Sequence, residues 1–146
     1  MMASAKLLVA ATLLSVGAVA CSDLTGNVNA AGSFSLKQVS DQQGTTNVPY
    51  SFTDNNGNNI FLQSDTYVLN TNGTYQETRF QTVNGQAESP SEFGNWNQSG
   101  NTVFFTPSQS DFDLTPYQGT VRNDSQFNGS RTLTISINGS TAIYTD

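Results

Sequence analysis

Histidine is absent from this sequence of 146 residues, and cysteine occurs once, at Cys21. Without histidine the chain lacks the commonest metal ligand and the side chain that most often serves as a general acid or base near neutral pH. Ser-His-Asp and Cys-His arrangements cannot be built, and a zinc site loses its two usual ligand types. We therefore expect no catalytic residues, no metal and no cofactor.

Charged residues are also scarce, at 11% of the chain against roughly a quarter in an average domain. The five lysines and arginines are scattered, and the formal net charge is −6. Because nucleic-acid binding requires clustered basic residues that neutralise phosphates, the sequence predicts no nucleic-acid partner. Paired carboxylates could in principle hydrolyse glycosides, and Glu77, Glu88 and Glu92 are candidates by type alone. So few charges, with no sign of an extended cleft, argue against that activity.

The first residues have the order of a secretory signal peptide. Residues 1–6 carry one positive charge, residues 7–14 form an apolar run in which Thr12 is the one polar residue, and mostly small residues follow up to Cys21. The apolar run is too short for a comfortable transmembrane helix, which needs about 20 residues. We predict a signal peptide over residues 1–20, and an N-terminal helix that anchors the chain in the membrane is the alternative.

Residues 18–21, Ala-Val-Ala-Cys, resemble the lipobox of bacterial lipoproteins. In that family the signal peptide is removed before the cysteine, so the resemblance implies that Cys21 is lipidated and becomes the first residue of the mature chain. It also implies, from Ser22, the periplasmic face of the outer membrane. Two acyl chains anchor a protein stably, where one holds marginally. Ordinary cleavage after Ala20 is the alternative, because the residues before it also fit a small-residue cleavage site.

A flexible tether and one β domain are expected after the cysteine. Residues 21–31 are small and polar and show no periodicity, whereas residues 32–146 contain strand and turn signals throughout. About eight segments alternate apolar and polar residues, and short turns such as Asn-Gly join most of them. Residues 41–59 are predicted as a polar loop, and an irregularity is predicted near Ser64.

This pattern predicts an all-β fold, a small antiparallel meander barrel of about eight strands. Each strand has one polar and one apolar face, and closing the sheet removes exposed edges. About eight strands enclose an interior that side chains fill or that holds one small ligand. A β-sandwich is the alternative, because two packed sheets require the same alternation.

Three motifs of this domain resemble the small lipocalin-like lipoproteins of bacteria. They are Gly-Ser-Phe at residues 32–34, Gly-Thr-Tyr at residues 73–75 and Gly-Asn-Trp at residues 94–96. The last hairpin, residues 133–146, is similar to the closing hairpin of that family. The resemblance implies a cup-shaped barrel that in many members binds an apolar small molecule, and it does not imply an enzyme.

Aromatic side chains are the candidates for a ligand-binding site. Small-molecule sites are usually apolar pockets with a few polar groups, and tyrosine supplies both an apolar ring and a hydroxyl. The same side chains could instead fill the interior, because the sequence does not give the strand register. The candidates are Tyr67, Tyr75, Phe80, Trp96, Phe105, Tyr117 and Tyr144.

Residues 54–65 superficially resemble a calcium-binding loop, with Asp54 at the first place and Asp65 at the twelfth. The glycine stands at the fourth place rather than the sixth, and no helical pattern flanks the segment. We therefore predict a turn-rich loop that binds no calcium.

Two functions fit a small barrel held at the cell envelope. The barrel binds a small apolar ligand, or its core is filled and it serves as a non-catalytic structural or interaction lipoprotein that contacts another envelope protein. An open interior cavity of a few hundred Å³ would favour the first function. A filled interior with an exposed apolar patch would favour the second. We expect a monomer in either case.

Overall fold

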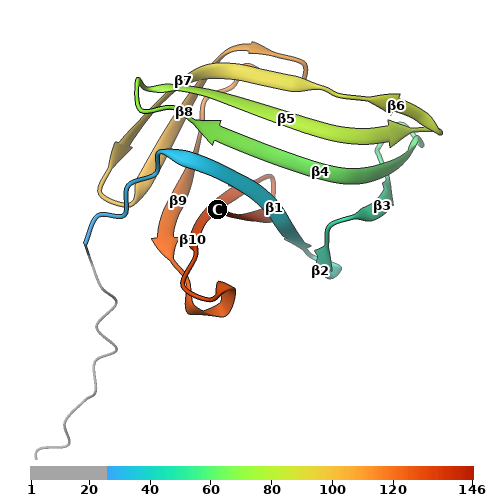
Figure 1. Cartoon of the computed structure of the whole chain (residues 1–146). Helices are drawn as coiled ribbons and strands as arrows, with labels where there is room; N and C mark the ends of the chain where they lie inside the picture. The colour runs from blue at the N-terminus through green and yellow to red at the C-terminus, as the bar shows by residue number, and fades with distance from the viewer. Residues whose placement is uncertain (1–25) are drawn as a thin grey trace, which may run out of the picture.

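The computed structural model describes residues 26–146, and the predicted signal peptide and Cys21 lie outside them (Figure 1). Within these residues, no helix has the length and apolar character needed to cross a membrane. The strands are β1 (Gly32–Asp41), β2 (Gly44–Asn47), β3 (Tyr50–Thr53), β4 (Asn59–Leu69), β5 (Thr74–Val83), β6 (Gln86–Glu88), β7 (Ser91–Ser99), β8 (Thr102–Ser110), β9 (Tyr117–Asn123), β10 (Arg131–Ile137) and β11 (Ser140–Thr145), with a short helix η1 (Ser125–Phe127).

Eight of these strands form a closed antiparallel barrel, which confirms the predicted barrel and excludes the sandwich. Strands β4, β5, β7, β8, β9, β10 and β11 follow one another around the wall. Strand β1 completes it, because Phe34 pairs with Tyr67 of β4 and Leu36 pairs with Tyr144 of β11. With partners along both edges, β1 leaves no free edge for another chain.

The predicted polar loop and the segment that follows β5 contain short additional strands. β2 and β3 lie within residues 41–59, and β6 follows the turn at Asn84 and Gly85. Their residues are almost all exposed, so no apolar alternation marks them in the sequence. The irregularity predicted near Ser64 is confirmed as a bulge, because the register of β4 against β5 shifts between Leu62 and Ser64.

The end of the barrel near the start of β1 has an apolar interior. Phe34, Val103, Val121 and Leu133 are fully buried and come from four different strands. They occupy inward positions of their strands, along which side chains alternate between the two faces, as the predicted pattern of one buried face requires. Burial of each such side chain contributes roughly 1.5–3 kcal/mol.

Arg131 closes this end of the barrel. Its Nη1 donates to the carbonyl oxygens of Asn29 at 2.7 Å and Ala31 at 2.8 Å, and its Nε donates to Asp146 Oδ2 at 2.7 Å. The guanidinium carbon lies 5.2 Å from the centre of the Phe34 ring. The first and last residues of the barrel are thereby joined through one side chain.

Residues 28–31, at the end of the predicted tether, lie against the closed end. Ala30 is fully buried and its N–H donates to Gln98 Oε1 at 2.9 Å. The N–H of Val28 donates to Asn101 Oδ1 at 3.1 Å. The described part of the predicted tether is therefore packed on the barrel rather than extended from it.

Candidate functional site

The opposite end of the barrel contains an open cavity of about 610 Å³. Its lining differs between strands. On β1, β10 and β11 the lining includes the apolar side chains of Val39, Ile135 and Ala142, whereas on β5 and β7 it is charged. The polar part of the lining includes Tyr67, Glu77, Arg79, Glu92, Tyr117 and Tyr144.

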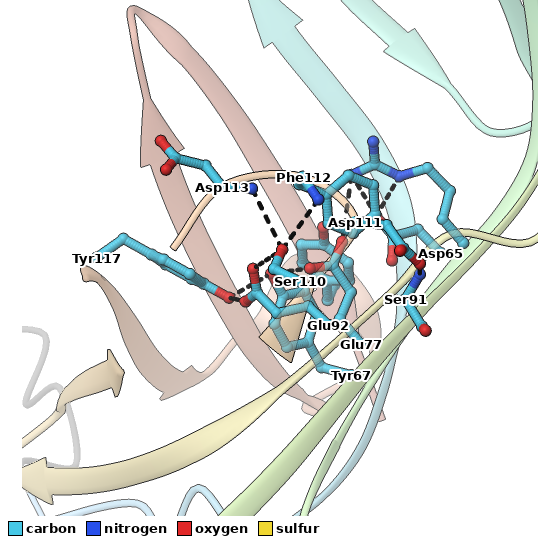
Figure 2. A network of polar contacts seen from close by, with 12 residues as sticks. Asp65, Tyr67, Glu77, Ser91, Glu92, Ser110, Asp111, Phe112, Asp113 and Tyr117 are labelled. Carbon is cyan, nitrogen blue, oxygen red and sulfur yellow. Dashed lines mark hydrogen bonds and ion pairs between the residues drawn. The ribbon is translucent and has the colours of Figure 1, made fainter. Parts of the chain in front are cut away.

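Glu92, on β7, accepts hydrogen bonds from three hydroxyl groups (Figure 2). Its Oε1 accepts from the hydroxyls of Tyr75 and Tyr117, both at 2.6 Å, and its Oε2 accepts from Ser110 Oγ at 2.8 Å. The residue is only 3% exposed. These donors supply the hydrogen bonds that a buried carboxylate requires.

Gly94 makes room for one of these donors. A Cβ at this position would lie 2.7 Å from Cε1 of the Tyr75 ring and closer still to the carbonyl oxygen of Thr106. A side chain at residue 94 would therefore displace Tyr75, whose hydroxyl holds Glu92. This requirement gives the Gly-Asn-Trp motif of the sequence a physical role.

Asp65, Glu77 and Arg79 form a second cluster beside Glu92. Arg79 donates from Nε and Nη2 to Asp65 Oδ2 at 3.2 and 3.1 Å, and from Nη2 to Glu77 Oε1 at 3.2 Å. The Tyr67 hydroxyl donates to Glu77 Oε2 at 2.9 Å, and the Tyr144 hydroxyl donates to Asp65 Oδ2 at 3.2 Å. One arginine and two tyrosines thus hold two buried carboxylates.

The register of the sheet explains why these side chains meet. Tyr67 of β4 lies opposite Glu77 of β5, and Glu77 lies opposite Glu92 of β7. Directly opposite residues on one face of a sheet have Cβ atoms about 4.5–5.5 Å apart. The hydroxyls of Tyr67 and Tyr117 are 3.0 Å apart and join the two clusters across the interior.

Burial changes the protonation of this network. Burial, together with the negative charge of Asp65, raises the pKa of Glu77 to about 8, while Arg79 opposes the rise. Burial also raises the pKa of Asp65, again opposed by Arg79, and it raises the pKa values of Tyr67 and Tyr144 well above those of free tyrosine. The tyrosines therefore remain hydroxyl donors, and burial favours the protonated form of Glu77.

The connection between β8 and β9 is tied to the cavity through Ser110. The Ser110 hydroxyl donates to Glu92 and accepts from the N–H groups of Phe112 at 3.0 Å and Asp113 at 3.2 Å. Figure 2 shows this hydroxyl between the carboxylate and the loop backbone. A cavity carboxylate and a loop that lines the cavity therefore share one side chain.

Two further contacts hold the same loop. Asp111 Oδ2 accepts from the N–H of Ser91 at 2.9 Å. The Arg79 guanidinium carbon lies 4.5 Å from the centre of the Phe112 ring, a cation–π contact. The loop thus lies against Arg79 of the polar wall.

Five of the predicted aromatic residues point into the barrel. Tyr67, Tyr117 and Tyr144 line the cavity. Tyr75 and Phe105 are buried, with ring centres 5.1 Å apart, and contact the rings that line it.

The other two predicted residues do not line the cavity. Phe80 is 48% exposed on the outer face of β5. Trp96 is half-buried and its Nε1 donates to the carbonyl oxygen of Asn70 at 3.0 Å, beside the turn before β5. The aromatic character of a residue does not indicate whether its side chain faces the interior or the outside, so the sequence could not separate these two from the inward residues.

The sequence did not predict the charged cavity residues Glu77, Arg79 and Glu92 as a binding site. It offered the two glutamates only as candidates for glycoside hydrolysis, and Asp65, which Arg79 holds, only as part of a calcium-like loop. The sequence did contain a sign of this site. Tyr75, Glu77 and Arg79 stand at every second position of a predicted strand and therefore share one face of it.

The turn-rich loop predicted for residues 54–65 is a turn only up to residue 58, because strand β4 begins at Asn59. Asp54 holds this turn. Its carboxylate accepts from the N–H groups of Asn56 and Asn58 at 2.9 and 2.8 Å.

Comparison with known proteins identifies the fold. No family model and no curated protein matches the chain. Among solved structures, a lipocalin-like protein from Bacteroides uniformis is similar, with 16% sequence identity and a TM-score of 0.50 over 80% of this chain and 96% of that chain. At this identity the likeness shows a lipocalin-like barrel fold and nothing further.

Proposed function

We propose that this lipocalin-like barrel binds a small molecule in its cavity. The cavity itself carries the proposal, because its volume of about 610 Å³ lies within the roughly 300–1,000 Å³ of small-molecule sites. Its lining combines apolar side chains with a few fixed polar groups, as such sites require. The alternative, an interaction protein with a filled core, gives no reason for this cavity.

We propose binding rather than catalysis for the carboxylates. Glu92 accepts three hydroxyl hydrogen bonds, and Glu77 is bonded to Tyr67 and Arg79. A catalytic nucleophile or base needs an oxygen that is available to the substrate and activated by a neighbour. Carboxylates with this many partners are better suited to orienting a bound molecule.

Titration with Nile red, a neutral apolar fluorophore, tests ligand binding. We expect a saturable rise in fluorescence with one site per chain. Ala142→Trp should abolish it, because Ala142 lies in the apolar wall and the larger side chain fills the cavity. Val68→Trp is the control, because Val68 is 39% exposed on the outer face of β4. A wild-type protein without saturable binding, or equal binding by the folded Ala142→Trp protein, would overturn the proposal.

We also propose that the protein is a lipoprotein of the bacterial cell envelope, anchored through Cys21 and facing the periplasm. The signal-like residues 1–20 and the lipobox-like residues 18–21 support this. Cys21→Ala should move the protein from the membrane fraction to the soluble fraction or block its maturation, whereas Ser22→Ala should leave it on membranes. Unchanged membrane association of the Cys21→Ala protein would contradict the anchor.

A further inference from the structure

The polar wall of the cavity holds more acidic than basic groups. Glu77 and Glu92 line the cavity and are 4% and 3% exposed, and Arg79 is the basic residue beside them. Asp65 is 1% exposed and is not part of the lining, but it accepts hydrogen bonds from two residues that are, Arg79 and Tyr144. The remaining basic residues of the described chain lie elsewhere, with two on exposed strand positions and one at the closed end: Lys37, Arg122 and Arg131.

The positive charge of Arg79 is already matched. It forms ion pairs with Asp65 at 3.1 Å and Glu77 at 3.2 Å, and the Phe112 ring lies against its guanidinium. An anionic ligand would lie close to these buried carboxylates. The other basic residues among residues 26–146 do not line the cavity, so none of them could pair with the ligand's charge. The cavity therefore disfavours the carboxylate head group of a fatty acid.

Glu92 has no basic partner within the described residues, and it lines the cavity. An ionised carboxylate offers about four acceptor positions, and the hydroxyls of Tyr75, Tyr117 and Ser110 use three of them. Glu77 stands directly opposite Glu92 on the neighbouring strand. Two carboxylates in this arrangement repel each other unless a proton or a cation lies between them.

A second observation shows that the buried carboxylates have a hydrogen-bond acceptor for which the described chain supplies no donor. The Oδ1 atom of Asp65 is buried and has no hydrogen-bond partner among residues 26–146. Glu77, its neighbour, has its pKa raised to about 8 by burial and by the charge of Asp65. The unpartnered Oδ1 belongs to a carboxylate that is short of donors, and the raised pKa of Glu77 shows that Arg79 offsets only part of the effect of burial and of the Asp65 charge.

We propose that the cavity binds an organic cation, an amphiphile whose protonated amine lies against Glu77 and Glu92. The apolar part of the ligand lies against Val39, Ile135 and Ala142 on the opposite strands. This inference rests on the proposed binding function and names its ligand class. Tyrosine rings in the same wall add to it, because aromatic rings attract cations.

Isothermal titration of the purified protein with three ligands of equal chain length tests the ligand class. The ligands are octylamine, octanol and octanoate, each kept below the concentration at which it forms micelles. We expect octylamine to bind at least about tenfold more tightly than octanol, because hydrogen bonds to charged groups are about twice as strong as neutral ones. Octanoate should bind most weakly.

Charge-removing variants locate the amine. Glu92→Gln should weaken octylamine binding by about tenfold and leave octanol binding unchanged, because the amide carries no charge to hold the ammonium group and hydrogen bonds between charged groups are about twice as strong as neutral ones. Glu88→Gln is the matched control, since Glu88 is exposed on β6 and does not line the cavity. Thermal melts verify that each variant is folded. If Glu92→Gln is unfolded, Glu77→Gln replaces it, and the comparison of the three ligands on the wild-type protein needs no variant.

The outcomes separate this inference from the binding function. Octanol or octanoate binding as tightly as octylamine would overturn the cationic ligand while the binding function stands. So would Nile red binding that octylamine does not displace. Failure of Nile red and of all three ligands to bind would overturn both proposals.

Discussion

Glu77 lies at the centre of the buried polar network, and its protonation depends on groups from five strands. The titratable and charged groups that surround it come from β4, β5, β7, β9 and β11 and are Asp65, Tyr67, Arg79, Glu92, Tyr117 and Tyr144. Burial outweighs the single arginine in setting its pKa.

Stability should therefore fall as the pH rises from about 5 to about 8. The pKa of Glu77 is raised from 4.5 to about 8 in the folded protein, so the folded state binds more protons than the unfolded state between these values. The favourable contribution of this bound proton to stability is fully present below about pH 4.5, the ordinary pKa of the glutamate side chain, and is lost as the pH rises through about 8. Urea unfolding at about pH 5, 6.5 and 8 measures this slope.

Glu77→Gln should remove most of this pH dependence, because the amide does not titrate. Glu88→Gln should retain it, since Glu88 is exposed. A wild-type free energy of unfolding that is constant or increases over this range would contradict the assignment of the proton to Glu77.

Gly94→Ala should destabilise the barrel by about 1–3 kcal/mol or more, because the new methyl group overlaps the Tyr75 ring and the Thr106 carbonyl. Gly26→Ala is the control, since no atom lies within 4 Å of a Cβ placed there. Thermal unfolding compares the two. Equal melting temperatures for both variants would show that β7 shifts without cost.

At the scale of elements, the loop between β8 and β9 depends on one hydroxyl. Ser110→Ala removes the acceptor of the Phe112 and Asp113 N–H groups and one donor to Glu92. We expect amide hydrogen exchange at Phe112 and Asp113 to accelerate by about tenfold, since each lost bond contributes about 1 kcal/mol. Ser108→Ala is the control, because that hydroxyl donates only to the Phe93 carbonyl. Unchanged amide exchange rates in the Ser110→Ala protein would show that the contact between the Phe112 ring and the Arg79 guanidinium is sufficient to hold the loop.

The long strands were predictable from the sequence, whereas the short ones were not. Leu133 and Ile135 alternate with polar residues in the sequence and lie buried in β10. The Asn-Gly pair at Asn138 and Gly139 has positive φ angles of 51° and 83°, as a two-residue hairpin requires. β2, β3 and β6 pair through their backbones with the long strands β1, β4 and β5. Backbone pairing of exposed residues requires no alternation of apolar and polar side chains, so the sequence does not indicate these strands.

At the scale of the whole molecule, Arg131 joins the two ends of the described chain. Arg131→Met should lower the free energy of unfolding by about 2–3 kcal/mol, because it removes charged hydrogen bonds to Asn29, Ala31 and Asp146. Arg122→Met is the control, since Arg122 is exposed on β9. Urea unfolding measures both, and a loss no larger than the control's would contradict the closing role of Arg131.

The candidate site was only partly predictable, because it depends on register between strands distant in sequence. Tyr67 and Tyr117 are 50 residues apart, and their hydroxyls meet only once the barrel has closed. The sequence indicated inward aromatic residues and an apolar ligand. It did not indicate that Glu77 and Glu92 would stand opposite each other, because adjacent strands can pair in more than one register.

If Cys21 carries a lipid, as proposed, the packing of residues 28–31 on the closed end would set the orientation of the molecule at the membrane. The chain from Cys21 to Val28 reaches at most about 25 Å, so a lipid on Cys21 would hold that end toward the bilayer. The strands would then point away from the lipid, and β1 would run from that end to the cavity, which Val39 lines near the end of the strand. The closed, apolar end of the barrel would then lie between the bilayer and the cavity and keep the opening away from the lipid head groups. A ligand would enter the cavity from the surrounding water rather than by lateral diffusion out of the membrane.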